Sequence, residues 1–267
     1  IDYITISTTG NATDFGDLSA AVYNLAATTN GTRGVFGGGQ LVSNNSRIVT
    51  IEYITIASTG NATDFGDLTL ARNGLAATTN VTRGVFGGGY GSSSSNVIDY
   101  ITIATTGNAT DFGDLTVARY DLAAMGDGTY GLFGGGTTGS ATNAIDYITI
   151  ASTGNATDFG DLTVARFKLA AVGGDTRGVF GGGNGNSDVM DYVTIATPGN
   201  ATDFGNLTVA RNALGATTDG ARGVFGGGYS NDRIDVLDYI TIASTGNATD
   251  FGNLTVARNR LAGTSGT

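Results

Sequence analysis

Two short stretches return through the whole chain: Ile-Asp-Tyr-Ile-Thr-Ile (residues 1–6) and Gly-Asn-Ala-Thr-Asp-Phe-Gly-Asp-Leu (residues 10–18). Copies of the first begin at residues 1, 51, 98, 145, 190 and 237, at spacings of 50, 47, 47, 45 and 47 residues. A third block, Gly-Val-Phe-Gly-Gly-Gly or a close variant, ends at Gly39, Gly89, Gly136, Gly183 and Gly228. One structural unit is therefore repeated, and a period of this length is typical of solenoids, propellers and arrays.

Each repeat divides into four short β-type pieces separated by Gly, Asn and Asp. In the second copy we expect strands at residues 51–57, 68–72, 75–79 and 83–87. No segment has a sustained apolar stripe at the helical period, so we expect almost no helix. Four strands in about 47 residues indicate one propeller blade, because solenoid coils are usually shorter. The sequence thus predicts a single all-β domain over residues 1–267, a six-bladed β-propeller with four-stranded blades.

The repeats resemble the kelch family. The segment 83–89 looks like the second kelch strand with its glycines, and 98–103 looks like the third strand. Phe112 stands where kelch repeats usually have Trp, and Val-Ala-Arg at 117–119 matches the end of the fourth strand. The resemblance covers the whole chain and implies a kelch-like propeller.

The two ends of the chain predict how the ring closes. The chain begins at a third strand and finishes at residues 261–264, which we interpret as a first strand. We therefore expect N- and C-terminal strands to share one blade, which would remove the open sheet edges of a linear array. No Phe-Gly-Gly-Gly block follows residue 264, so the last repeat is incomplete. We expect that the natural chain continues; the alternative is an incomplete blade.

The composition narrows the function classes. The chain has 23 acidic and 13 basic residues, a formal net charge of -10, which disfavours nucleic acid as a partner. It lacks His, Cys and Trp, and His and Cys are the usual ligands for zinc, copper and haem. We expect no membrane insertion, because there is no run of 18 apolar residues. We also expect no catalytic residues, no metal and no cofactor.

Repeated polar motifs have structural and functional interpretations. The Phe-Gly-Gly-Gly blocks lack the helix and Lys of a phosphate loop, so we expect them to shape turns. The acidic pairs that begin at Asp14 and Asp17 favour turn-forming hydrogen bonds, with bound calcium as the alternative. Six Asn-Ala-Thr patterns form turns or accept N-glycans; their asparagines are Asn11, Asn61, Asn108, Asn155, Asn200 and Asn247.

An acidic residue recurs inside the apolar third strand, where an unpaired carboxylate is costly. Asp2 is the first of these residues. Two series of arginines are candidate partners: Arg33, Arg83, Arg177 and Arg222, and also Arg72, Arg119, Arg166, Arg211 and Arg258. Tyr130 replaces Arg in the first series, so not every arginine of that series is required. We expect these pairs to hold strands or blades together.

The connections between second and third strands differ in every copy, and we expect all five on one rim. Unlike loops on a constant scaffold are suited to specific binding, with neutral drift as the alternative. The candidate ligand-binding residues there are Arg47, Tyr90, Asn186, Asp188, Asp232 and Arg233.

The repeats also resemble those of tail-fibre and other virion proteins of tailed bacteriophages. That resemblance implies a non-enzymatic structural or attachment module on a particle surface, with a virion or extracellular location. The expected partners are other virion or surface proteins, with a host glycan or receptor as a further candidate. The first alternative is a secreted or cell-surface bacterial propeller that binds carbohydrate or protein. The second is a glycan-cleaving propeller enzyme.

Overall fold

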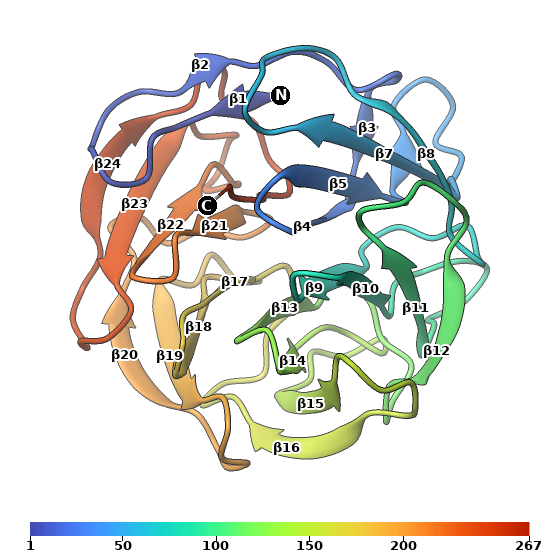
Figure 1. Cartoon of the computed structure of the whole chain (residues 1–267). Helices are drawn as coiled ribbons and strands as arrows, with labels where there is room; N and C mark the ends of the chain where they lie inside the picture. Colours follow the sequence, from blue (N-terminus) through green and yellow to red (C-terminus); the bar gives the residue numbers. More distant parts are fainter. Residues whose placement is uncertain (267) are drawn as a thin grey trace.

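The computed structural model describes residues 1–266, and every regular element in that range is a β-strand. The strands form sheets arranged radially around a central axis, as in a β-propeller (Figure 1). Five sheets have four strands each, and we call them the first to fifth blades. The six-bladed prediction is therefore wrong: the ring has five blades.

The five blades follow one another along the chain. The first contains β4 (Ala26–Thr29), β5 (Arg33–Gly37), β7 (Thr50–Thr55) and β8 (Thr63–Asp67), and the second contains β9 (Ala76–Thr79), β10 (Arg83–Gly87), β11 (Val97–Thr102) and β12 (Thr110–Asp114). The third contains β13 (Ala123–Gly126), β14 (Tyr130–Gly134), β15 (Ala144–Thr149) and β16 (Thr157–Asp161). The fourth contains β17 (Ala170–Gly173), β18 (Arg177–Gly181), β19 (Val189–Thr194) and β20 (Thr202–Asn206). The fifth contains β21 (Gly215–Thr218), β22 (Arg222–Gly226), β23 (Val236–Thr241) and β24 (Thr249–Asn253).

All five blades are antiparallel meanders with the same register. In the second blade Val85 faces Thr78 of β9 and Tyr100 of β11. A β-bulge interrupts the pairing of β11 with β12 between Ile98 and Asp99, and bulges of this kind bend a strand and increase its twist. The first strand of each blade lies nearest the central axis (Figure 1). The second strand pairs with it on one side and with the third strand on the other.

The cores lie between blades, because both faces of each sheet are covered by neighbours. Nine buried side chains fill the space between the second and third blades, among them Val85, Phe112, Phe133 and Ile148. Apolar residues on both faces of a strand suit a sheet that is covered on both sides. The predicted strand at residues 68–72 is wrong, because the fourth strand is Thr63–Asp67, where Phe65 is buried between blades.

The blade expected to combine the two ends of the chain is where the prediction fails. The N-terminal copy of the repeat forms only a two-stranded sheet of β1 (Asp2–Tyr3) and β2 (Thr13–Asp14), which we call the two-stranded unit. The expected first strand at residues 261–264 forms no strand of any sheet, and Gly266 makes a single bridge to Gly31. Since residues 1–266 provide no second strand between this segment and β1, the two described ends of the chain do not share a sheet. A further small sheet joins β3 (Val22–Tyr23) to β6 (Gln40–Leu41).

The ring nevertheless closes, through contacts repeated around its outside. In each copy the Gly-Asn-Ala segment runs along the fourth strand of the preceding blade. Gly107 and Ala109 donate backbone hydrogen bonds to Phe65 and Asp67, and the Asn108 Oδ1 accepts one from the Asp67 amide. The same three bonds join residues 10–12 to Phe251 and Asn253 of the fifth blade. The uniform Gly-Asn-Ala-Thr-Asp-Phe-Gly segment is thus the outer joint between neighbours.

A second closure lies near the axis. In each repeat, the residue before the leucine that leads to the first-strand position has a positive φ of 55–62°. Its backbone amide donates a hydrogen bond to the carbonyl of the equivalent residue in the preceding repeat. The residues are Asn24, Gly74, Asp121, Lys168, Ala213 and Arg260. Asn24 in turn bonds to Arg260, so the six hydrogen bonds form a closed ring.

Candidate functional site

Four buried ion pairs hold adjacent blades together. Arg72 and Asp99 lie 2.8 Å apart and Arg119 and Asp146 lie 3.1 Å apart, all with fully buried side chains. Arg166–Asp191 and Arg211–Asp238 repeat the arrangement. Burial lowers the pKa of the Arg119 guanidinium, and the Asp146 carboxylate partly offsets this. The expected pairing of the third-strand acid with the arginine after strand four is confirmed at these four positions, whereas Glu52 accepts a hydrogen bond from the Ser19 amide instead.

The other arginine series has a different contact. Arg83 lies 4.5 Å above the Tyr100 ring and donates to the carbonyl of Ile150 in the next blade. Arg222 makes the equivalent bond to the carbonyl of Ile6, so it links the fifth blade to the N-terminal segment. These arginines form cation–π contacts and inter-blade hydrogen bonds; the acids of the third strand pair with the other series.

The repeated acidic turns form no metal cluster. Within residues 1–266 no three acidic side chains come together in a group that could hold a metal ion. The six asparagines of the Asn-Ala-Thr patterns are exposed, and each Oδ1 accepts an inter-blade hydrogen bond like that of Asn108. These side chains thus join neighbouring blades rather than bonding within their own turn, and glycosylation and calcium binding stay predictions.

The unlike connections gather on one face of the ring. In an antiparallel meander the connections between strands two and three leave from the same ends as those that enter each blade. Backbone hydrogen bonds join the two kinds of connection directly: Tyr90 pairs with Asn73, and Tyr229 pairs with Asn212. We call the face that carries these connections the variable face.

The variable face brings Arg47 and Tyr90 together from two blades. The Arg47 guanidinium lies 4.8 Å from the centre of the Tyr90 ring. Tyr90 also packs edge-on against Tyr120, with ring centroids 5.0 Å apart. Arg47 is exposed and both tyrosines are partly exposed. A cation and two aromatic rings therefore form a compact group at the surface, which we call the tyrosine cluster.

The remaining predicted residues lie elsewhere on this face. The Asn186 Oδ1 accepts a hydrogen bond of 2.7 Å from Asn212. Asp188 is partly buried, and its backbone carbonyl accepts the Leu207 amide. Asp232 and Arg233 are exposed and line a separate groove beside the fifth blade. The six predicted residues are thus spread over four connections, and Arg47 and Tyr90 touch across two of them.

Sequence reasoning missed the residues beside the axis. Asp121 is partly buried, and burial raises its pKa above the usual range, with Lys168 and Arg260 partly offsetting this. Arg260 also lies 5.3 Å from the centre of the Tyr23 ring. The signal was present in the sequence: this position, just before the first strand, holds a different residue in all six copies.

No helix within residues 1–266 has the length and apolar character needed to cross a membrane. A scan of the chain against protein-family models finds no match, and a search of the curated proteins finds none either.

Proposed function

We propose that this propeller is a non-enzymatic recognition module whose variable face binds a glycan of a host or receptor. The tyrosine cluster of Arg47, Tyr90 and Tyr120 is the observation that carries the proposal. Aromatic rings offer flat apolar surfaces to the C–H faces of a sugar, while an arginine supplies hydrogen-bond donors to its hydroxyl groups. The cluster has both kinds of group at an exposed place.

The constant part of each repeat supports a binding role for the variable part. Asp99, Arg119 and their equivalents are used in buried pairs between blades. The joint residues and the ring near the axis are likewise used to close the scaffold. Residues that differ between copies are consequently those available for recognition, and loops on a rigid scaffold are common binding sites.

Display on a particle surface is part of the same proposal. The repeats resemble those of bacteriophage tail-fibre and virion proteins, and the kelch resemblance is consistent with a binding propeller. Electron microscopy of particles labelled with an antibody to the chain tests this location. Label on fibres or virions is the expected result, and a free monomer in the medium contradicts it.

A glycan array tests recognition. We expect the purified chain to bind at least one class of glycan and the Tyr90→Ala variant to bind it about tenfold more weakly, or about 1.4 kcal/mol. Val81→Ala is the matched control, because Val81 is 82% exposed and lies in the turn before β10, at the other end of the blade. A blank array, or binding that Tyr90→Ala leaves unchanged, overturns the proposal.

A further inference from the structure

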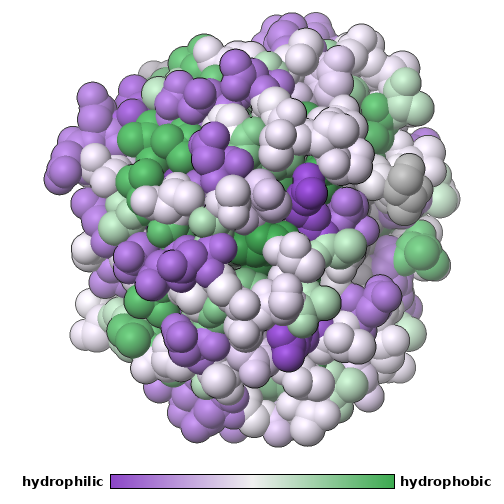
Figure 2. All heavy atoms as spheres, turned by 90° about the vertical axis from the view of Figure 1, so that its left-hand side faces the viewer, coloured by the Kyte–Doolittle hydropathy of each residue, from purple (hydrophilic) through white to green (hydrophobic). Residues whose placement is uncertain are grey.

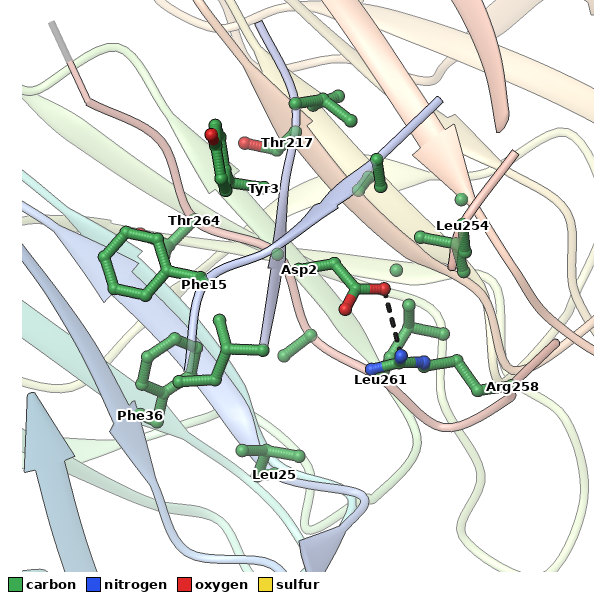
Figure 3. A pocket seen from close by; sticks show the side chains of 18 of the residues that line it. Asp2, Tyr3, Phe15, Leu25, Phe36, Thr217, Leu254, Arg258, Leu261 and Thr264 are labelled. Carbon is green, nitrogen blue, oxygen red and sulfur yellow. Dashed lines mark hydrogen bonds and ion pairs between the residues drawn. The ribbon is translucent and has the colours of Figure 1, made fainter. Parts of the chain in front are cut away.

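A large groove occupies the sixth position of the ring, where residues 1–266 provide no second strand. It has a volume of about 1880 Å³ and is lined by the two-stranded unit, residues 261–266 and the facing sides of the first and fifth blades. Small-molecule pockets usually measure about 300–1,000 Å³, so this space exceeds what such a ligand needs. In Figure 3, Phe15, Phe36, Leu25, Leu254 and Leu261 surround it, and Asp2 and Arg258 lie on one side. We call it the strand groove.

The packing beside the groove is incomplete. Between complete blades the buried apolar clusters contain nine or ten residues. On the two sides of the groove the clusters contain three each: Phe15, Phe36 and Ile54 on one side, and Val224, Leu237 and Phe251 on the other. Figure 2 shows green apolar atoms in hollows between polar residues on the side that includes the fifth blade. Apolar surface is therefore left without the neighbour that it has elsewhere.

A glycine of the fifth blade leaves room for an aromatic ring. A Cβ atom on Gly37, Gly87 or Gly181 would meet the Phe ring of the next blade's second strand, at Phe86, Phe133 or Phe225. A Cβ on Gly226 would meet only Leu237 of its own blade. The space over Gly226 thus corresponds to the place that a second-strand phenylalanine fills in the rest of the ring.

Polar groups at the groove also lack a partner that they have elsewhere. Arg72, Arg119 and Arg211 donate to the carbonyl of the second-strand phenylalanine of the following blade, at 3.0–3.3 Å. Arg258, the equivalent residue, pairs with Asp2 at 2.9 Å but has a side chain that is 36% exposed, against 0–2% in the other pairs. Tyr3 is 44% exposed. The edge of β1 that faces the groove corresponds to the edge that pairs with a second strand in every blade.

We propose that the strand groove binds an extended segment of another polypeptide by β-strand addition. The segment has the pattern Gly-Val-Phe-Gly, with a small residue, a β-branched residue, an aromatic residue and a second small residue in order. The register of the five blades places its first Gly opposite Ile4, its Val opposite Tyr3 and its Phe opposite Asp2. Main-chain hydrogen bonds provide affinity in this mode, and the slot over Gly226 provides specificity for the aromatic ring.

Cross-linking tests the proposal directly, because the chain has no cysteine. The probe is a synthetic peptide with the sequence of residues 82–90, in which the Val85 position is replaced by Cys, and the protein partner is the Tyr3→Cys variant. Directly opposite residues of an antiparallel pair have Cβ atoms about 4.5–5.5 Å apart, near enough for a disulfide after small adjustment. We expect a mixed disulfide in mild oxidant, and a concentration-dependent rise in Tm when unmodified peptide is added to the wild-type chain.

Two controls fix the register and the place. A peptide with Cys at the Phe86 position should not cross-link to Tyr3→Cys, because neighbouring residues of a strand point to opposite faces. Tyr53→Cys is the matched protein control, since Tyr53 already faces Val35 in a complete blade. Equal cross-linking of Tyr3→Cys and Tyr53→Cys, or no cross-linking and no rise in Tm, overturns the proposal. A dimer that forms without peptide and is dispersed by it also does so, because a second copy would then be the occupant.

Discussion

The backbone amide of Asn24 donates a hydrogen bond of 3.1 Å to the carbonyl of Arg260, although the two residues lie near opposite ends of the sequence. This bond is the last of six that form a closed ring near the axis. All six donors have the left-handed backbone conformation, which costs a non-glycine residue about 1–3 kcal/mol unless the surroundings hold it. Residues with an unfavourable conformation therefore recur where the blades meet.

The Asp121→Asn substitution should stabilise the chain at neutral pH. Burial raises the pKa of Asp121, so the folded state favours the protonated carboxyl. The stability that Asp121 contributes is complete below its unfolded pKa and is lost as the pH rises through its folded pKa. We expect the variant to have a higher Tm than the wild type at pH 7 and an equal Tm at a pH below the unfolded pKa. Asparagine fits this position, since Asn24 is its equivalent.

Thermal unfolding between pH 3 and pH 8 measures this difference. Asp175→Asn is the control for the general loss of one negative charge, because Asp175 lies on an exposed turn. A gain in Tm at pH 7 that is the same for both variants would assign the effect to net charge rather than to Asp121.

Loss of a buried Arg–Asp pair should lower the free energy of unfolding much more than loss of the Arg258–Asp2 pair, which closes the ring. Arg119→Met leaves the Asp146 carboxylate buried without its partner, which typically costs about 3–5 kcal/mol. Arg258→Met removes the pair with Asp2, whose arginine is 36% exposed, and we expect about 1 kcal/mol or less. Denaturant unfolding gives both free energies. Similar losses in the two variants would contradict this ranking.

Of the two glycines in the outer joint at residues 60–66, Gly66 should tolerate substitution by alanine much less well than Gly60. A Cβ on Gly66 would lie 2.5 Å from the carbonyl oxygen of Gly107 in the next blade, whereas a Cβ on Gly60 would meet no atom within 4 Å. Both glycines have positive φ, so both alanine variants carry backbone strain of about 1–3 kcal/mol. Only Gly66→Ala adds a clash with backbone that cannot move freely.

We expect Gly66→Ala to lower the free energy of unfolding by at least about 2 kcal/mol more than Gly60→Ala, since large losses come from overpacking of this kind. Amide hydrogen exchange of β8 measures the local effect. Equal protection of β8 in the two variants would show that the joint has room for a methyl group.

The sequence by itself determined the repeated unit. The periods of 45–50 residues and the turn residues between short β-type pieces predicted four-stranded blades, and five such blades are present. The third-strand acids in apolar strands predicted the Arg–Asp pairs, because a buried carboxylate needs a partner. Arg47 and Tyr90 were predicted as surface residues of unlike connections, and they touch.

Only the tertiary structure decided how the ends meet and where side chains from different blades gather. Residues 261–264 have the composition of a first strand, but a strand needs a neighbour that satisfies its backbone groups, and β1 lies one strand away. The place of Tyr120 beside Tyr90, and of Asp121 near Lys168 and Arg260, follows from the rotation between blades. Sequence spacing does not contain that rotation, because it depends on packing between residues far apart in the chain.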